Sequence, residues 1–145
     1  MSQQTPRGPF RADQVGSLLR PRSVVEARAA LASGQLDVEQ LRAVENEAVR
    51  AAVVAQHQVG LRAITDGEYR RAWWHFDFLA GLDGVELVDT DTSLPFQGAA
   101  TKHQNIAVTG KVQFNRHYML EHYRFLAAAV AELAPDAIAK MTVPA

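Results

Sequence analysis

The sequence has no cysteine among its 145 residues. This absence excludes disulfide bonds, a thiolate nucleophile and any metal site that depends on cysteine thiolates. Disulfides are rare in cytoplasmic proteins, so the composition fits that compartment and we expect a cytoplasmic protein.

Long apolar runs and a dominant charge are also missing. No stretch approaches the ~18–20 consecutive apolar residues that a membrane-spanning helix requires. The first eight residues, MSQQTPRG, lack the apolar segment of a signal peptide, so we expect residues 1–9 to form a disordered tail. The formal net charge is −1 and Lys and Arg form no dense patch, which argues against nucleic acid or a membrane as a partner.

The sequence has the composition of a globular domain. Apolar residues make up 48% of the chain and charged residues 21%, and a chain of this length buries a sizeable core. Ser23 followed by Glu26, and Asp37 followed by Gln40, have the spacing of capping boxes, so each pair predicts the start of a helix. The second helix is expected over 38–59, with an apolar stripe formed by Leu41, Val44, Ala48, Ala51, Ala52, Ala55 and Val59.

Helical spacing predicts a third long helix over 116–133, which Pro135 ends. Three valines of the second helix lie partly off its stripe and indicate more than one packing partner; they are Val49, Val53 and Val54. Four strands are predicted: a short extended piece at the start of FRADQVGSLLRP, and apolar segments at 61–65, 105–112 and 137–143. Residues 84–88 would form a further short strand. Strands that alternate with helices favour right-handed βαβ units, so we expect an α/β fold whose four core strands form a parallel sheet.

The segment ITDGEYRRAWWHFDF, residues 64–78, has two carboxylates where the first predicted strand ends. In parallel α/β folds ligands bind at the carboxyl ends of the strands. We therefore expect Asp66 and Glu68 to share one edge of the sheet with residues 15–17, residues 110–111 and the residues after Val143. Such an edge is where a polar substrate would be held.

Simpler interpretations of these residues remain open. Asp66 and Glu68 would also suit a solvated turn, with Glu68 paired to Arg70 or Arg71. Gly16 and Ser17 would suit a turn between a strand and a helix, which is compatible with binding. The neighbouring aromatic residues favour packing over a stacking platform for a pterin ring; they are Trp73, Trp74, Phe76 and Phe78.

The histidines give little support to a metal site. His117 and Glu121 have the spacing of one helix face, but the helices of a barrel face away from its active site. His57 lies near a helix end, where a favourable contact with the helix dipole suffices. Lys102 and His103 lie in a polar insert and favour a solvated loop over an anion site.

Five blocks of the sequence, from Phe10 to Pro144, resemble the amino-terminal half of the cobalamin-independent methionine synthase family, in particular its short, single-barrel members. The blocks are FRADQVGSLLRP, GLRAITDGEYRRAWWHFDF, GVEL, YRFL and AKMTVP. The resemblance implies a TIM (β/α)8 barrel, of which residues 10–145 would form the amino-terminal half with about four core strands. It also implies a methyltransferase that moves a methyl group from 5-methyltetrahydrofolate, or its polyglutamate form, to the thiol of homocysteine.

The same resemblance implies roles for individual residues. Gly16 and Ser17 would donate hydrogen bonds to the carboxylate of the amino acid, and Glu68 would accept from its ammonium group. Asp66 would orient Glu68 or a neighbouring arginine, and Trp74 would line the pocket. These roles suit a zwitterion, which needs donors at one end and an anionic acceptor at the other.

The sequence differs from the family in the residues that bind the metal. The family binds zinc through one His, two Cys and one Glu of its carboxyl-terminal half, and these 145 residues contain no cysteine. A (β/α)8 barrel needs ~250 residues. We therefore expect this chain to hold no zinc and no catalytic residue, to be inactive alone, and to pair with the missing half or with a second copy rather than persist as a stable monomer.

Two other functions remain open at this stage. The chain could be a non-catalytic, self-associating half-barrel that retains an amino-acid site. It could also belong to another TIM-barrel enzyme, such as a porphyrinogen-decarboxylase-like protein.

Overall fold

The computed structural model describes residues 10–73, 75–90 and 104–144. The expected tail, the candidate pocket residue Trp74, and Lys102 and His103 lie outside these residues. The chain divides into two compact units, which are described separately. The first contains the described residues of 1–70 and 121–142, and the second contains those of 71–120 and 143–145.

The first unit contains α1 (Arg22–Ala32), α2 (Val38–Gln58) and most of α4 (Met119–Leu133). The capping box predicted for α2 is confirmed. The Asp37 carboxylate accepts from the backbone N–H of Gln40 over 2.8 Å, and the Gln40 side chain accepts from the backbone N–H of Asp37 over 2.9 Å.

The capping box predicted for α1 is wrong. The helix begins after Pro21, whose fixed φ suits a helix start, and no side chain caps it. Ser23 consequently lies inside the first turn, and Glu26 forms an ion pair with Arg22 (2.6 Å).

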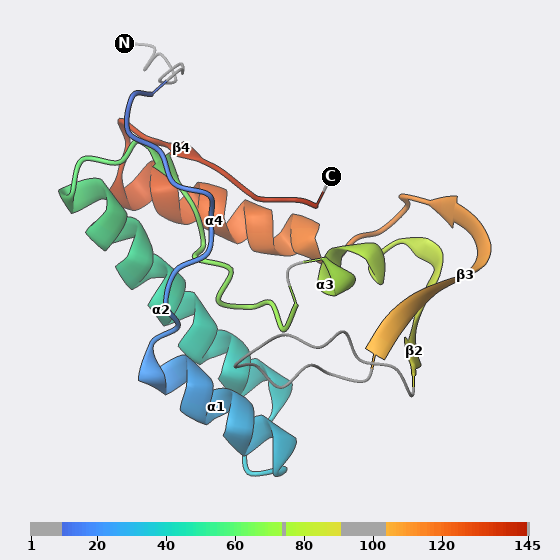
Figure 1. Cartoon of the computed structure of the whole chain (residues 1–145). Helices are drawn as coiled ribbons and strands as arrows, with labels where there is room; N and C mark the ends of the chain where they lie inside the picture. The colour runs from blue at the N-terminus through green and yellow to red at the C-terminus, as the bar shows by residue number, and fades with distance from the viewer. Residues whose placement is uncertain (1–9, 74, 91–103, 145) are drawn as a thin grey trace, which may run out of the picture. The chain divides into compact units, whose positions relative to one another are not determined.

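A small parallel sheet joins distant parts of this unit. β1 (Ala63–Ile64) pairs in parallel with β4 (Ile138–Ala139), with Ala63 opposite Ile138 and Ile64 opposite Ala139. Figure 1 shows the two strands beside α2 and α4. The strands predicted at 61–65 and 137–143 are present in a parallel arrangement, although both are shorter than expected.

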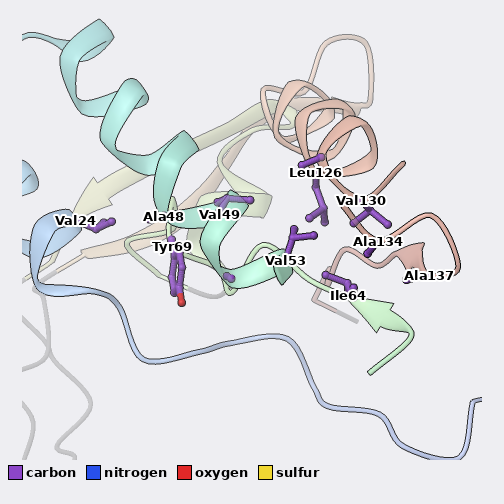
Figure 2. Packing of buried hydrophobic residues seen from close by; sticks show 12 residues of the cluster. Val24, Ala48, Val49, Val53, Ile64, Tyr69, Leu126, Val130, Ala134 and Ala137 are labelled. Atoms are coloured by element: carbon purple, nitrogen blue, oxygen red, sulfur yellow. The ribbon is translucent and has the colours of Figure 1, made fainter. Parts of the chain in front are cut away.

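The core of the first unit lies between these helices and β1. Figure 2 shows Val49 and Val53 of α2 in one cluster with Leu126 of α4 and Ile64 of β1. Val49 and Val53 are fully buried, whereas three members of the predicted stripe, Ala51, Ala55 and Val59, are exposed. The prediction of the stripe was therefore wrong in part, because α2 packs against both α1 and the α4 side and its buried face is turned by one residue.

The second unit contains α3 (Phe76–Leu79), β2 (Asp83–Asp89) and β3 (Gln104–Gln113). β2 and β3 pair antiparallel, with Val85 opposite Val108 and Leu87 opposite Ile106. The strand at 105–112 was predicted to belong to a parallel sheet, and that prediction was wrong. A parallel connection needs a crossover, usually a helix, and the sequence predicts none between them.

The described residues thus form a mixed α/β structure with one small parallel sheet. The expected half-barrel with about four parallel strands is not confirmed, since the described residues contain one parallel pair, β1 with β4, and the predicted strand at 105–112 pairs antiparallel. Among the described helices, none has the length and apolar character to cross a membrane.

Candidate functional site

The amino-terminal segment is bound to the end of β1 by backbone and side-chain hydrogen bonds. The Thr65 hydroxyl donates to the carbonyl oxygen of Gly16 over 2.7 Å, and the backbone N–H of Leu18 donates to the carbonyl oxygen of Gly67 over 3.0 Å. Residues 16–18 therefore lie beside residues 65–67, although almost fifty positions separate them in the sequence.

The buried side-chain amide of Gln56 stabilises this arrangement. The Gln56 side chain is 4% exposed; it accepts from the backbone N–H of Thr65 (3.0 Å) and donates to the carbonyl oxygen of Thr65 (2.9 Å). The Gln14 side chain donates to the amide oxygen of Gln56 (2.9 Å) and to the Thr65 hydroxyl (2.9 Å). Because a buried polar group without partners is costly, this network holds the segment and the strand end in one position.

Lys140, directly after β4, binds the same segment. Its ammonium group lies 2.7 Å from the Asp13 carboxylate and donates to the carbonyl oxygen of Gln14. The hydrogen bond from Lys140 is the largest contribution that lowers the pKa of Asp13. The ends of both parallel strands thus contact the amino-terminal segment.

The turn after β1 carries the two predicted carboxylates. Asp66 is 4% exposed, and its Oδ1 accepts from the backbone N–H of Glu68 over 2.9 Å. Gly67 and Glu68 both have positive φ, at 66° and 58°. A left-handed conformation is unfavourable for a residue such as glutamate, and strain of this kind clusters at functional sites.

The Glu68 side chain lies against Gly16 and Thr142. The Thr142 hydroxyl donates to Glu68 Oε1 over 2.5 Å. A Cβ atom at Gly16 would lie 3.2 Å from the same Oε1 and only 2.4 Å from the Thr142 Cγ2. Three segments, the amino-terminal one and those after β1 and β4, therefore meet at this carboxylate.

The structure brings together Gly16, Ser17, Asp66 and Glu68, as the sequence predicted. Ser17 is exposed beside Gly16, and none of the hydrogen bonds found among the described residues involves its side chain. Their proposed roles toward a ligand stay predictions.

Gly110 and Lys111 were predicted at the carboxyl end of a parallel strand, and this was wrong. Both lie inside β3, where a Cβ on Gly84 would be 2.7 Å from the carbonyl oxygen of Lys111. The close backbone approach at the β2–β3 bulge accounts for the glycine at position 84, with a φ of 73°.

Two arginines donate hydrogen bonds to backbone carbonyl oxygens in and beside the turn after β1. Arg20 donates to the carbonyl oxygen of Glu68 over 3.4 Å, and Arg28 donates to that of Tyr69 over 2.8 Å. Arg70, which the simpler interpretation paired with Glu68, instead donates to the Asn46 side chain over 2.6 Å.

Burial shifts the pKa of two residues next to the candidate site. It lowers the pKa of Arg70, whose guanidinium carbon lies 4.9 Å from the centre of the Phe125 ring. Burial, together with the Asp66 carboxylate, raises the pKa of Tyr69. The turn therefore rests on partly desolvated side chains rather than on a fully solvated loop.

Sequence reasoning missed Gln14, Gln56, Thr65 and Thr142. Gln56 and Thr65 are polar residues in otherwise apolar elements, and that contrast was a usable signal. Thr142 follows the apolar strand β4 as Asp66 follows β1, so the same rule about strand ends would have selected it.

The aromatic residues of the second unit pack on one another. Trp73 contacts His75 and Phe76, with ring centres 6.2 Å and 5.8 Å apart. His117, which is 4% exposed, stacks on Phe114 at 5.4 Å. These contacts favour packing over a stacking platform for Trp73 and Phe76.

The described residues do not supply a zinc site. They contain no group of three or more His, Asp or Glu side chains that could hold a metal. His117 uses both ring nitrogens within the protein, since Nε2 lies 2.8 Å from the carbonyl oxygen of Phe78 and Nδ1 accepts from the N–H of Met119. The donor set therefore does not fit the zinc that the family resemblance implies.

Two curated proteins of Bacillus subtilis (strain 168) are similar to almost the whole chain. YxjG is 49% identical over 143 residues, which are 99% of this chain and 37% of YxjG. YxjH is 47% identical over 138 residues, which are 95% of this chain and 36% of YxjH. Both are named as uncharacterized proteins, and the chain spans little more than a third of their length. No family model matches the chain.

Among solved structures, a candidate vitamin-B12-independent methionine synthase from Listeria monocytogenes is similar to the chain. The TM-score is 0.76 and the sequence identity is 36%, over 99% of this chain and 38% of that one. In sequence and in fold, the chain is therefore similar to one part of a methionine-synthase-like structure.

Proposed function

We propose that the chain supplies the amino-acid-binding part of a methyltransferase of the methionine-synthase type. The reaction would transfer the methyl group of 5-methyltetrahydrofolate, or of its polyglutamate form, to the thiol of homocysteine. The similarity to the Listeria structure supports the reaction class. The site at the end of β1 supports the choice of an amino acid as ligand.

One observation carries this proposal: residues 16–17 and Glu68 lie at the same strand end although they are distant in sequence. A zwitterionic amino acid needs hydrogen-bond donors for its carboxylate and an anionic acceptor for its ammonium group. The exposed Ser17 hydroxyl would supply a donor, and the Glu68 carboxylate would supply the acceptor.

Asp66 would act through Glu68 rather than on the ligand. Its carboxylate is buried and accepts from the backbone N–H of Glu68, so it holds the turn in the conformation that presents Glu68. This agrees with the orienting role that the resemblance implies for Asp66.

The thiol and the folate would be handled elsewhere in the complete protein. Zinc supplies thiolate at neutral pH when it is bound in such enzymes, but the described residues do not fit it, and no step is assigned to this chain through the metal. The missing partner would be the remaining part of a longer chain or a second copy.

Titration calorimetry of the 145-residue chain with L-methionine and L-homocysteine tests the proposal. We expect Glu68→Gln and Ser17→Ala each to weaken the affinity about tenfold, the effect of losing a hydrogen bond to a charged group. Glu47→Gln is the matched control, because Glu47 is an exposed glutamate of α2 far from the turn in sequence.

The two outcomes are distinct. Unchanged affinity in Glu68→Gln, or no binding by the unsubstituted chain, would contradict the proposed site. Zinc analysis of the purified chain adds an independent check, since stoichiometric, tightly held metal would contradict the assignment of the metal to another part of the protein.

A further inference from the structure

Thr142 contacts the carboxylate that the proposed function assigns to the ammonium group of the ligand. It lies three residues after β4, which ends at Ala139, and its hydroxyl donates to Glu68 Oε1 over 2.5 Å. A hydrogen bond to an ionised acceptor is short and stronger than one between neutral groups. Seventy-four positions separate the two residues, so only the pairing of β1 with β4 brings them together.

The methyl group of Thr142 is also closely packed. It occupies the space in front of Gly16, where a Cβ atom would lie 2.4 Å from the Thr142 Cγ2. Thr142 is half-buried, and its β-branched side chain has restricted rotation about χ1. The hydroxyl is therefore held in a fixed direction by the backbone at position 16.

The geometry limits the position of the Glu68 side chain. A glutamate side chain that is free to rotate loses conformational entropy when it binds a ligand. A donor that holds Oε1 in one position reduces this loss.

We propose that Thr142 is a positioning residue that directs the Glu68 carboxylate toward the ammonium group of the amino-acid ligand. This inference rests on the proposed function, because it concerns the same site. Thr142 contributes to selectivity for ligands with a charged amino group, and it does so through Glu68 rather than through its own contact with the ligand.

Two variants separate the hydroxyl from the shape of the side chain. Thr142→Val removes the donor and keeps the branched shape, and we expect it to weaken L-methionine binding about tenfold in calorimetry. Thr142→Ser keeps the donor, and we expect an affinity within about twofold of the unsubstituted chain. Equal losses in both variants would show a packing role and overturn the inference.

A ligand without the amino group supplies a readout that a structural role would not change. We expect 4-(methylthio)butanoate, the analogue of methionine that lacks the amino group, to bind the unsubstituted chain and Thr142→Val equally. A tenfold loss for this analogue in Thr142→Val would overturn the inference, because the effect would then not pass through the ammonium group.

A double-mutant cycle tests whether Thr142 acts through Glu68. In the Glu68→Gln background, we expect Thr142→Val to change the affinity for L-methionine less than twofold. Additive losses would overturn the inference. Circular dichroism of every variant checks that the fold is kept, and Thr142→Ser remains informative if the valine variant does not fold.

The failure of this inference differs from the failure of the proposed function. If Glu68→Gln weakens binding but Thr142→Val does not, only the role of Thr142 is wrong. If Glu68→Gln has no effect, or the unsubstituted chain does not bind L-methionine, the proposed site is wrong and the role of Thr142 is wrong with it.

Discussion

The buried carboxylate of Asp66 accepts a hydrogen bond from the backbone N–H of Glu68 over 2.9 Å and closes the turn after β1. The turn gives Glu68 a φ of 58°, which glycine adopts readily and glutamate does not. The chain therefore keeps a glutamate where a glycine would suit the backbone better. Retention of an unfavourable residue at a strand end is the pattern expected of a ligand-binding position.

This conformation predicts a difference between two substitutions at position 68. Both Glu68→Ala and Glu68→Gly remove the carboxylate, so their comparison isolates the backbone cost. We expect the glycine variant to have the higher free energy of unfolding, by about 1 kcal/mol, because it has no Cβ to resist the positive φ. Urea denaturation of the two variants measures the difference. Equal stability would show that the turn relaxes when the side chain is removed.

The close packing at Gly16 predicts a loss of stability that a second substitution should partly restore. Gly16→Ala would place a Cβ 2.4 Å from the Thr142 Cγ2, so we expect the free energy of unfolding to fall by about 1–3 kcal/mol. Thr142→Ser removes that methyl group, and we expect the double variant to recover part of the loss. Urea denaturation of the four proteins of this cycle measures both effects. If the serine gives no recovery, the contact with Thr142 is not the cause of the loss.

Asp136 predicts a dependence of stability on pH. Its carboxylate lies 2.5 Å from His57 Nε2 and 2.8 Å from Arg62 Nε. The hydrogen bond from His57, more than any other favourable contact, lowers the pKa of Asp136 below its usual 3.8. A carboxyl group with a depressed pKa stabilises the fold above its unfolded-state pKa, and this contribution is lost as the pH falls through the folded-state value.

We therefore expect Asp136→Asn to reduce the acid sensitivity of the protein. The free energy of unfolding of the unsubstituted chain should fall more steeply between pH 5 and about 3 than that of the variant. Asp89→Asn, at the exposed end of β2, is the control and should keep the original slope. Parallel slopes for the unsubstituted chain and Asp136→Asn would contradict the contribution of this ion pair.

The amino-terminal segment predicts self-association of the 145-residue chain. Val15 and Leu19, on either side of residues 16–18, are 88% and 95% exposed. Exposed large apolar side chains favour association. We expect size-exclusion chromatography with light scattering to give a mass above 15.9 kDa, and Val15→Lys with Leu19→Lys to lower it.

A matched control is available for this prediction. Val59, at the end of α2, is 78% exposed but lies apart in sequence from this segment. Val59→Lys should leave the mass of the assembly measured by light scattering unchanged. A monodisperse, cooperatively unfolding monomer would contradict the prediction for the unsubstituted chain.

Local sequence patterns predicted the helices well, because their signals act over a few residues. The Asp37–Gln40 capping box and the spacing of apolar residues identified α2, which ends at Gln58, one residue before the expected end. The face that α2 buries was predicted less well. Val49 and Val53 lie in the core because α2 packs on more than one side, and no periodic pattern within one helix determines how many neighbours it has.

The pairing of strands was only partly predictable. β1 and β4 lie in a parallel arrangement, as expected of the strands at 61–65 and 137–143. The strand predicted at 105–112 instead pairs antiparallel, as β3 with β2. The residues of a strand indicate how well it fits a pleated, half-buried surface. They do not specify whether the neighbouring strand runs parallel or antiparallel to it.

The sequence by itself determined the choice of Gly16, Ser17, Asp66 and Glu68 as candidates, from the rule that ligands bind at strand ends and from the family resemblance. Only the tertiary structure decided that Thr142 and Gln56 belong to the same neighbourhood, and that Gly110 lies inside the antiparallel strand β3. The physical reason is the sequence separation of the interacting residues, because helix capping and apolar periodicity depend only on residues that are near each other in the chain. Which strand ends meet depends instead on hydrogen bonds and packing between residues that are far apart in the chain, such as Gly16 and Thr65 or Glu68 and Thr142.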